Sequence, residues 1–475
     1  MASVLLAGSP SLAEAVPKEN AAHRLIVLTD IEADPDDTQS LVRLVLYSNE
    51  IDIEGLIATT STHRRNHPQP DSIRRVVEKY GLVRDNLERH APGYPSEEEL
   101  YRRIKTGSTV YGMEGVGPGK DSEGSDWIIR VLEEDDNRPV WASVWGGPNT
   151  LAQALFTIRE TRSEGEATRL IDKLRVYTIS DQDDSGAWIR RSFPDLFYIV
   201  SPGRYGRSTW SAISRQFPGF DESISNEWLA VNIQQGHGPL GAHYPDVAWG
   251  VEGDTPSFLS LIPNGLNVPD HPNWGGWGGR YELYVPDPSD IGVGAEAEGH
   301  VPIEPETRPI WTNAADRFTP WVRTRFGRSI GPTDDTYEDN YVTLMRWRDD
   351  FQRDFAARMD WTTMEYEEAN HPPVAELAHE REMVAKSGQG IVLDGGMSRD
   401  PDGDSLTYHW FNYREAGTLD EAVEMGWAVN QPRVYVALPE VDKTEIVHFI
   451  LSLTDKGEPP LTRYARVIVT IVPED

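Results

Sequence analysis

Short apolar segments alternate with amphipathic segments over most of the first two thirds of this sequence. The apolar segments are almost continuously hydrophobic, as buried parallel strands are, and helix-like segments separate several of them. This alternation predicts a doubly wound α/β fold with a mostly parallel sheet. The segments that we interpret as strands are 24–30 (RLIVLTD), 51–61 (IDIEGLIATTS), 139–147 (PVWASVWGG), 173–180 (KLRVYTIS) and 195–203 (DLFYIVSPG), and the clearest helical segments are 125–135 and 149–161.

The 475 residues are enough for more than one domain, and the character of the sequence changes twice after the α/β region. Residues 255–330 are rich in Pro, Gly and Trp, and residues 338–368 read as one or two helices. The C-terminal region carries period-2 apolar runs separated by turn residues, which is typical of an Ig-like β-sandwich. We expect a signal remnant or disordered tail at 1–22, an α/β domain at 23–330, a helical connector at 331–370 and an Ig-like β-sandwich at 371–475.

The overall composition excludes several classes of function. The formal net charge is −32, from 45 basic and 77 acidic residues, and such a field repels the phosphates of nucleic acid polymers. No run of about 18 apolar residues is present, so we expect no membrane-spanning helix. The absence of cysteine excludes disulfides, zinc thiolate sites and thiol catalysis. The acidity suits a secreted protein or a cation binder.

Five acids fall within eight positions directly after the first apolar segment; they are Asp30, Glu32, Asp34, Asp36 and Asp37. In doubly wound folds, sites form where the strands end. Clustered like charges are costly unless a cation neutralises them, and carboxylate oxygens without thiolates favour Ca²⁺ or Mg²⁺. The alternative is an Asp-Pro-Asp turn in which an aspartate caps the following helix. Both interpretations remain open at this point.

The acidic segment resembles the N-terminal signature of a known enzyme family. Asp30, Glu32, Asp36 and Asp37 have the spacing D-x-E-x-x-x-D-D, and calcium-dependent nucleoside hydrolases have D-x-D-x-x-x-D-D. The segment GLIATTSTH resembles the second strand of that family. The segment VWGGPNTLAQAL resembles its strand-to-helix turn.

Nearly everything from residue 23 onward resembles a narrower group. This group consists of cellulose-binding-type proteins with a nucleoside-hydrolase-like domain and a C-terminal Ig-like domain. The segments that carry this resemblance are 177–203 (YTISDQDDSGAWIRRSFPDLFYIVSPG) and 252–266 (EGDTPSFLSLIPNGL).

The resemblance implies a calcium site and names the residues that would form it. Asp37 resembles a side-chain ligand, Asp254 resembles the late aspartate that closes the metal shell, and Asp30 matches the first acid of the signature. Glu32 stands where the family has an aspartate that contacts calcium and accepts a proton from water. The backbone carbonyl of Trp145 aligns with a carbonyl ligand.

The resemblance also implies residues that bind the sugar. Asp36 resembles the acid that binds a sugar hydroxyl, and we assign Glu32 and Asp36 as the catalytic pair. Asn232 resembles a sugar-binding asparagine. The family's His-Asp pair near the last ligand is not evident, so the leaving-group acid is unassigned. His237 and His243 are candidates for it, with a packing or surface role as the alternative.

Two further segments carry candidate sugar contacts. Asp183 and Asp184 follow a predicted strand and face either a substrate or only their own loop. Trp274 and Trp277 stand among glycines in NWGGWGG, where flat rings either stack on a sugar or pack against the core. A third segment, SRDPDGDSL (398–406), we interpret as an Asp-rich turn, with weak calcium binding as the alternative.

We therefore expect a calcium-dependent glycoside-type hydrolase that acts on a plant or microbial cell-wall carbohydrate, with an activated water attacking the anomeric carbon. The alternatives are a non-catalytic cellulose- or carbohydrate-binding protein with a vestigial site, and a nucleoside N-ribohydrolase. We expect a secreted or periplasmic protein whose partner is carbohydrate. The oligomeric state stays open, with a homodimer as one option.

Overall fold

The computed structural model describes residues 22–203, 205–218, 220–295, 300–323, 330–333, 335–425 and 428–474. Almost all of the predicted N-terminal tail therefore lies outside the described residues. Within the described ranges, no helix combines the length and the apolar character needed to cross a bilayer. The domain boundaries given above remain predictions.

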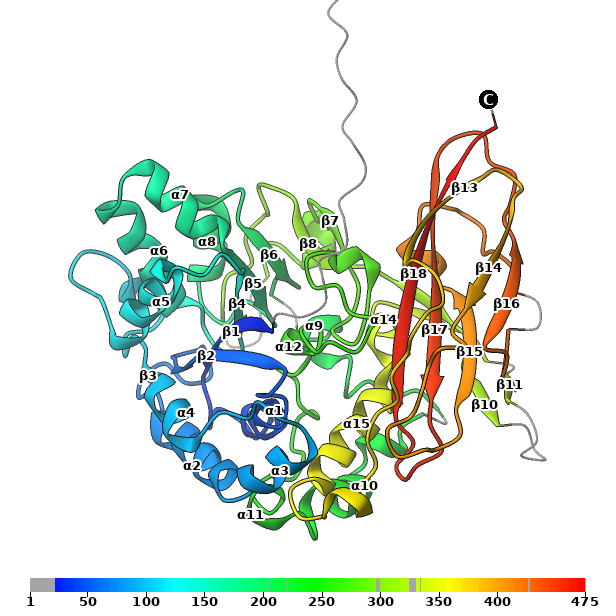
Figure 1. The fold of residues 1–475 in the computed structure, drawn as a ribbon. Helices are drawn as coiled ribbons and strands as arrows, with labels where there is room; N and C mark the ends of the chain where they lie inside the picture. The colour runs from blue at the N-terminus through cyan, green and yellow to red at the C-terminus, as the bar shows by residue number, and fades with distance from the viewer. Residues whose placement is uncertain are drawn as a thin grey trace, which may run out of the picture.

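An eight-stranded sheet forms the centre of the first part of the chain (Figure 1). Its strand order is β3-β2-β1-β4-β5-β6-β8-β7, and every neighbouring pair is parallel except β7 with β8. The predicted mostly parallel sheet is confirmed. Its strands are β1 (His23–Thr29), β2 (Ile51–Ala58), β3 (Ile104–Thr106), β4 (Val140–Val144), β5 (Leu174–Thr178), β6 (Phe197–Val200), β7 (Tyr281–Tyr284) and β8 (Ile310–Asn313).

Helices cover both faces of this sheet, and alternate side chains of its apolar strands pack into two separate hydrophobic cores. In β1, Leu25 and Val27 pack into one core, whereas Ile26 and Leu28 pack into the other. The helices on the first face are α1 (Asp36–Val45), α2 (Pro70–Gly81), α3 (Arg84–His90) and α4 (Glu97–Arg103). Those on the second face are α5 (Glu123–Glu133), α6 (Asn149–Thr161), α7 (Glu164–Asp172) and α8 (Ser185–Ser192).

Shorter elements complete the part of the chain before the C-terminal strands. The short helices are η1 (Gly112–Gly115), α9 (Ser208–Ser211), η2 (Glu222–Ile224), α10 (Asn226–Leu229), η3 (Ala230–Gln234), α11 (Gly238–Gly241), α12 (Pro256–Leu259), η4 (Pro272–Trp274) and α13 (Pro288–Ile291). Two small hairpins pair β9 (Asp316–Phe318) with β12 (Tyr337–Asp339) and β10 (Trp321–Arg323) with β11 (Ile330–Pro332). Two helices follow, as predicted for 338–368: α14 (Val342–Met345) and α15 (Arg348–Asp360).

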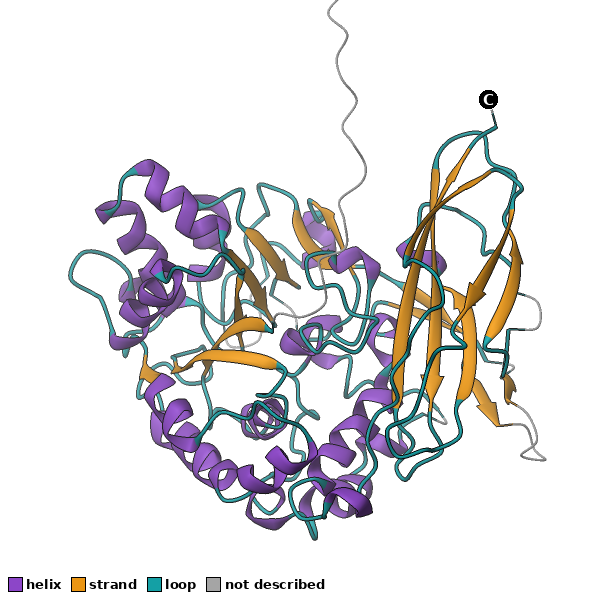
Figure 2. Cartoon of the chain, in the orientation of Figure 1, coloured by secondary structure: helices purple, strands orange, loops and turns teal. Residues whose placement is uncertain are grey.

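The C-terminal strands form two small sheets that pack over a common core, consistent with the predicted β-sandwich (Figure 2). One sheet has the order β13-β18-β17-β15, and the other pairs β14 with β16. The elements are β13 (Glu382–Lys386), β14 (Gly390–Asp394), β15 (Thr407–Asn412), β16 (Arg433–Ala437), β17 (Glu445–Thr454) and β18 (Thr462–Val472), with η5 (Tyr366–Glu368) before them and η6 (Arg414–Ala416) among them.

Helix α15 lies between the parallel sheet and the sandwich (Figure 1). Its Phe351 ring is 6.2 Å from that of Trp277, which in turn contacts Tyr464 of β18. The guanidinium of Arg466 on β18 donates to the carbonyls of Leu266 and Gly275. The two parts therefore meet across a packed, hydrogen-bonded junction.

Candidate functional site

The turn between β1 and α1 places two aspartates in the first turn of a helix. The Asp36 backbone N–H donates to Asp34 Oδ1 at 2.8 Å, and the Thr29 hydroxyl at the end of β1 donates to Asp37 Oδ1. Helix α1 begins after Pro35, whose position carries no side-chain cap. Asp36 and Asp37 therefore lie inside the helix, where its dipole favours negative charge, and neither acts as the N-cap proposed in the turn-and-cap interpretation.

The segment 252–255 reaches the same place because α1 holds it directly. Glu252 forms a buried ion pair with Arg43, and its backbone N–H donates to Gln39 Oε1 at 2.9 Å. The Thr255 hydroxyl donates to Ser40 Oγ at 2.9 Å. These contacts fix Asp254 opposite the first turn of the helix, although more than 200 residues separate them in sequence.

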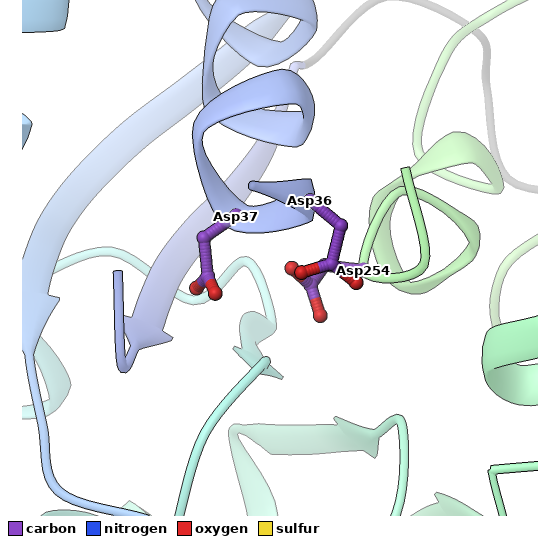
Figure 3. A group of neighbouring side chains, drawn as sticks. All are labelled: Asp36, Asp37 and Asp254. Carbon is purple, nitrogen blue, oxygen red and sulfur yellow. The ribbon is translucent and has the colours of Figure 1, made fainter. Parts of the chain in front are cut away.

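Asp36, Asp37 and Asp254 form a compact buried group (Figure 3). Each contributes one carboxylate oxygen to a set whose members all lie within 4.8 Å of one another. Burial raises the pKa of all three carboxyls well above the ordinary value, and repulsion from neighbouring aspartates adds to this. Asp254 Oδ2 has no hydrogen-bond partner among the described residues. An all-oxygen set with an unpartnered buried oxygen fits a hard divalent cation such as Ca²⁺.

Asp30 lies beside this group. Its carboxylate is buried, and it faces Gly146 at the end of β4, where an added Cβ would lie 2.9 Å from Oδ1. Burial raises the pKa of Asp30 to about 7, and the Ser61 hydroxyl opposes this rise. The negative charge of Asp30 contributes to the raised pKa values of Asp37 and Asp254. The structure thus places the first acid of the signature at the border of the buried group.

Two of the predicted metal ligands already have hydrogen-bond partners of their own. Glu32 adopts a positive φ of 74°, and its carboxylate accepts from the Ser72 hydroxyl and the Arg75 guanidinium of α2. The Glu32 side chain is 41% exposed. The Trp145 carbonyl accepts from the Gln182 amide, which leaves one of its lone pairs free. Neither residue belongs to the group of three, and their metal roles remain predictions from the resemblance.

The predicted sugar-binding acids after β5 are held by local contacts. Asp183 Oδ1 accepts from the backbone N–H of Ser185 at 2.8 Å, whereas Asp183 Oδ2 is buried without a partner in the described part of the chain. Burial raises the pKa of Asp183 to about 7. Asp184 Oδ1 accepts from the backbone N–H of Met113 at 2.8 Å. Asp183 therefore keeps a free oxygen, and Asp184 fastens η1.

The structure supports the packing alternative for the glycine-flanked tryptophans. Trp277 is 0% exposed and lies in the junction with the sandwich, so its faces are not available to a sugar. Trp274 is only partly exposed, and its ring stacks on His271 with the centroids 4.0 Å apart. The sequence indicated two aromatic rings on a flexible scaffold, but these rings instead fill the interface between two parts of the fold.

The remaining candidates also make structural contacts. The Asn232 amide donates to the Trp228 carbonyl at 2.8 Å, four residues earlier. His237 is buried, and its Nε2 lies 2.9 Å from Asp360 Oδ1 on α15. Burial lowers the pKa of His243. These contacts favour packing over the general-acid role for His237.

An aromatic neighbour of the acid group was missed by the sequence reasoning. The Trp210 indole N–H donates to Asp36 Oδ2 at 2.8 Å, and the Tyr205 ring packs edge-on against Trp210. The chain accommodates this indole with glycines, because an added Cβ at Gly253 would collide with both Trp210 Nε1 and Asp36 Oδ2. Trp249, which stands four residues before Gly253, is 80% exposed. No spacing rule in the sequence connects Trp210 to Asp36.

These buried carboxyls predict a pH dependence that a cation removes. Without a cation, raised pKa values stabilise the fold fully below the ordinary Asp pKa of 3.8, and this stability is lost as the pH rises through the folded pKa, about 7 for Asp30. The loss from Asp30 alone has an upper limit of about 4 kcal/mol. In EDTA, the melting temperature should therefore decrease as the pH rises from about 5 to about 8. Addition of Ca²⁺ should raise the melting temperature more at the higher pH. A calcium-induced shift that is equal at both pH values would contradict this.

Comparison with known proteins supports the resemblance inferred from sequence. The family model described as cellulose-binding Sde182, nucleoside hydrolase-like domain, matches residues 24–281. The model described as cellulose-binding protein Sde0182, C-terminal domain, matches residues 390–471. No curated protein matches the chain.

One solved structure is similar over nearly the whole chain. It is described as a nucleoside hydrolase-related hypothetical protein from Saccharophagus degradans that is associated with carbohydrate metabolism. The two proteins are 35% identical, with a TM-score of 0.78 over 95% of this chain and 100% of the other. A PKD domain from KIAA 1837 protein is 20% identical over 22% of this chain and 90% of its own, and its TM-score of 0.17 carries no argument. Both the first family model and the Saccharophagus structure extend over more than half of the sequence, so the chain belongs to the family of cellulose-binding Sde182 proteins with a nucleoside hydrolase-like domain.

Proposed function

We propose that this protein is a secreted or periplasmic, calcium-dependent hydrolase that cleaves a glycosyl bond in a plant or microbial cell-wall carbohydrate. The observation that carries the proposal is the buried group of Asp36, Asp37 and Asp254, with its unpartnered Oδ2 on Asp254. The family description as cellulose-binding, and the similar structure's association with carbohydrate metabolism, support a carbohydrate as the substrate class.

Asp37 and Asp254 would hold the cation, with Asp36 beside them. When bound, Ca²⁺ supplies positive charge that offsets the three carboxylates and lowers the pKa of water at the site. The Thr29 hydroxyl donates a hydrogen bond to Asp37 Oδ1, so the orientation of the Asp37 carboxylate does not depend on the cation. The contacts of α1 with residues 252 and 255 do the same for Asp254.

Asp36 is the residue that would bind the sugar. Trp210 donates to its Oδ2, which orients the carboxylate and leaves Oδ1 to accept from a sugar hydroxyl. The exposed ring of Trp249, five residues before Asp254, provides a flat face of the kind on which sugar rings pack. Asp30 is the neighbouring acid that would take a proton from water, because it is buried beside the group and its pKa is raised to about 7.

A second candidate function is carbohydrate binding without catalysis. One observation favours it: Glu32, at the position where the resemblance puts the proton acceptor, is held by Ser72 and Arg75 of α2. If Asp30 does not replace Glu32 as the base, the cation would serve only to organise a binding site.

Removal of the cation is expected to abolish hydrolysis. We expect reducing-sugar release from a panel of cell-wall glycans to fall by at least about 1,000-fold in EDTA, and equally in Asp37→Ala, because a bound cation contributes several kcal/mol to transition-state stabilisation. The Asp246→Asn variant is the matched control, since this exposed aspartate lies eight residues before Asp254 in the chain and its carboxylate accepts a hydrogen bond from Gln234.

The same panel separates the alternatives. Retention of the protein on insoluble cellulose with no release from any glycan would support binding without catalysis. Ribose release from inosine or uridine would support nucleoside hydrolysis. Sugar release that persists in both EDTA and Asp37→Ala would contradict the calcium-dependent mechanism.

A further inference from the structure

The Asp-rich turn at residues 399–404 lies against the segment that enters the sandwich. The Asp402 carboxylate accepts from the His371 backbone N–H at 2.7 Å, and one of its oxygens lies 3.0 Å from His371 Nδ1. A β-bridge pairs Val374 with Arg399. The turn is therefore docked on the connector rather than extended into solvent.

Two side-chain oxygens at this contact are buried and lack partners. Asn370 Oδ1 and Asp400 Oδ2 accept no hydrogen bond from any residue that the structure describes. Asp400 Oδ1, in contrast, accepts from the backbone N–H groups of Asp402 and Asp404, both at 2.9 Å. The turn thus uses one Asp400 oxygen to fold itself and leaves the other oxygen buried and free.

A third buried side chain with carboxylate oxygens, Asp455, comes from the loop after β17. Asp455 is buried, and the Asn370 amide points at it, with Nδ2 lying 3.2 Å from each Asp455 oxygen. Asn370 itself is only 6% exposed. Burial raises the pKa of Asp455 to about 6, and the negative charge of Asp400 adds to this rise. Two acids thus repel each other beside a buried amide, an arrangement that is costly unless a positive charge offsets it.

We propose that Asn370, Asp400 and Asp455 hold a calcium ion, forming a second cation site that shares no residue with the Asp36 group. Two carboxylates and an amide oxygen, brought together from three chain segments, are the ligand types that Ca²⁺ takes, and Ca²⁺ tolerates the irregular geometry of such a site. Asp455 Oδ1 would keep its bonds from the backbone N–H groups of Gly457 and Leu461. The cation would replace the Asn370 amide N–H as the partner of Asp455 Oδ2, with the amide oxygen turned toward the cation.

The site would fasten the sandwich to the α/β part of the chain. His371 follows Asn370 directly, and its Nε2 lies 3.0 Å from His90 Nδ1 on α3. The His90 ring also stacks on Trp361 after α15, with 5.3 Å between the centroids. A cation that orders residue 370 would therefore order the aromatic stack on both sides of the junction, which assigns the site a structural role rather than a catalytic one.

Calcium titration of the full chain tests this inference. We expect calorimetry with Ca²⁺ alone to find two bound equivalents in the wild type, one in Asp37→Asn, one in Asp400→Asn and none in the double variant. Asp400→Asn retains Oδ1 for the two backbone N–H groups but removes the charge and the free oxygen. Asp442→Asn, an exposed change elsewhere on the sandwich, is the control and should bind two equivalents.

The outcomes distinguish the two sites from each other. If Asp400→Asn binds as many equivalents as the wild type, the junction site is overturned, whatever Asp37→Asn does. If Asp400→Asn loses an equivalent and Asp37→Asn loses none, the junction site stands and the Asp36 site fails. Melting in EDTA controls for folding, because Asp400→Asn, which relieves the repulsion of Asp455, should melt no lower than the wild type there and should lose only the stabilisation that Ca²⁺ adds.

Discussion

Replacing Asp254 with asparagine is expected to weaken calcium binding at the Asp36 group by at least about 100-fold, because changes outside the ligand shell already cost 10- to 100-fold. Asparagine has the same shape and retains an oxygen, but it removes one of three negative charges and the unpartnered Oδ2. Calorimetry in the Asp400→Asn background measures this effect without a contribution from the junction.

The same substitution should have the opposite effect on the cation-free protein. Asp254, Asp36 and Asp37 raise one another's cost of ionisation, so removal of one carboxylate should leave the melting temperature in EDTA unchanged or higher. Asp246→Asn, in the exposed part of the same loop, should change neither quantity. Undiminished affinity in Asp254→Asn would mean that these aspartates do not share a cation.

Asp36 and Asp37 could be located from the sequence because the strand before them and the helix that they open are both recognisable from local hydrophobic patterns. The run at 24–30 is a buried strand, and Asp36 and Asp37 open the next helix, so both fall at the carboxyl edge of the sheet. Asp254 could be joined to them only through the family resemblance, since the Arg43, Gln39 and Ser40 contacts that hold its loop follow no spacing rule.

The surroundings of other predicted site residues depend on tertiary contacts that the sequence does not show. Glu32 departs from the group because its backbone has a positive φ and Arg75 of α2 attracts its carboxylate. Trp277 looked like a ligand platform because its glycine neighbours permit close approach, but the partner that approaches is the sandwich, through Tyr464. A sequence pattern shows which residues precede and follow a given residue. It does not show which distant element packs against that residue in the fold.

Replacing Arg43 with methionine is expected to destabilise the protein by about 3–5 kcal/mol, the usual cost of leaving one member of a buried ion pair without its partner. Arg43 and Glu252 are both fully buried. The Arg43 guanidinium also donates to the Phe351 carbonyl at 3.1 Å and lies 4.0 Å from the centre of the Phe355 ring. The substitution therefore removes the Arg43 links from α1 to the Asp254 loop and to α15, and urea unfolding followed by tryptophan fluorescence measures the change.

Two further variants separate the charge from the packing. Arg353→Met breaks an exposed pair with Asp349 on the same helix α15 and should cost at most about 0.5 kcal/mol. Adding Glu252→Gln to Arg43→Met should restore part of the lost stability, because the buried negative charge is then gone, yet calcium affinity should stay below that of the wild type since the Asp254 loop still lacks its ion pair with α1. If Arg43→Met is no more destabilising than Arg353→Met, the ion pair does not hold the site together, and Asp254 must be positioned by Gln39 and Ser40 alone.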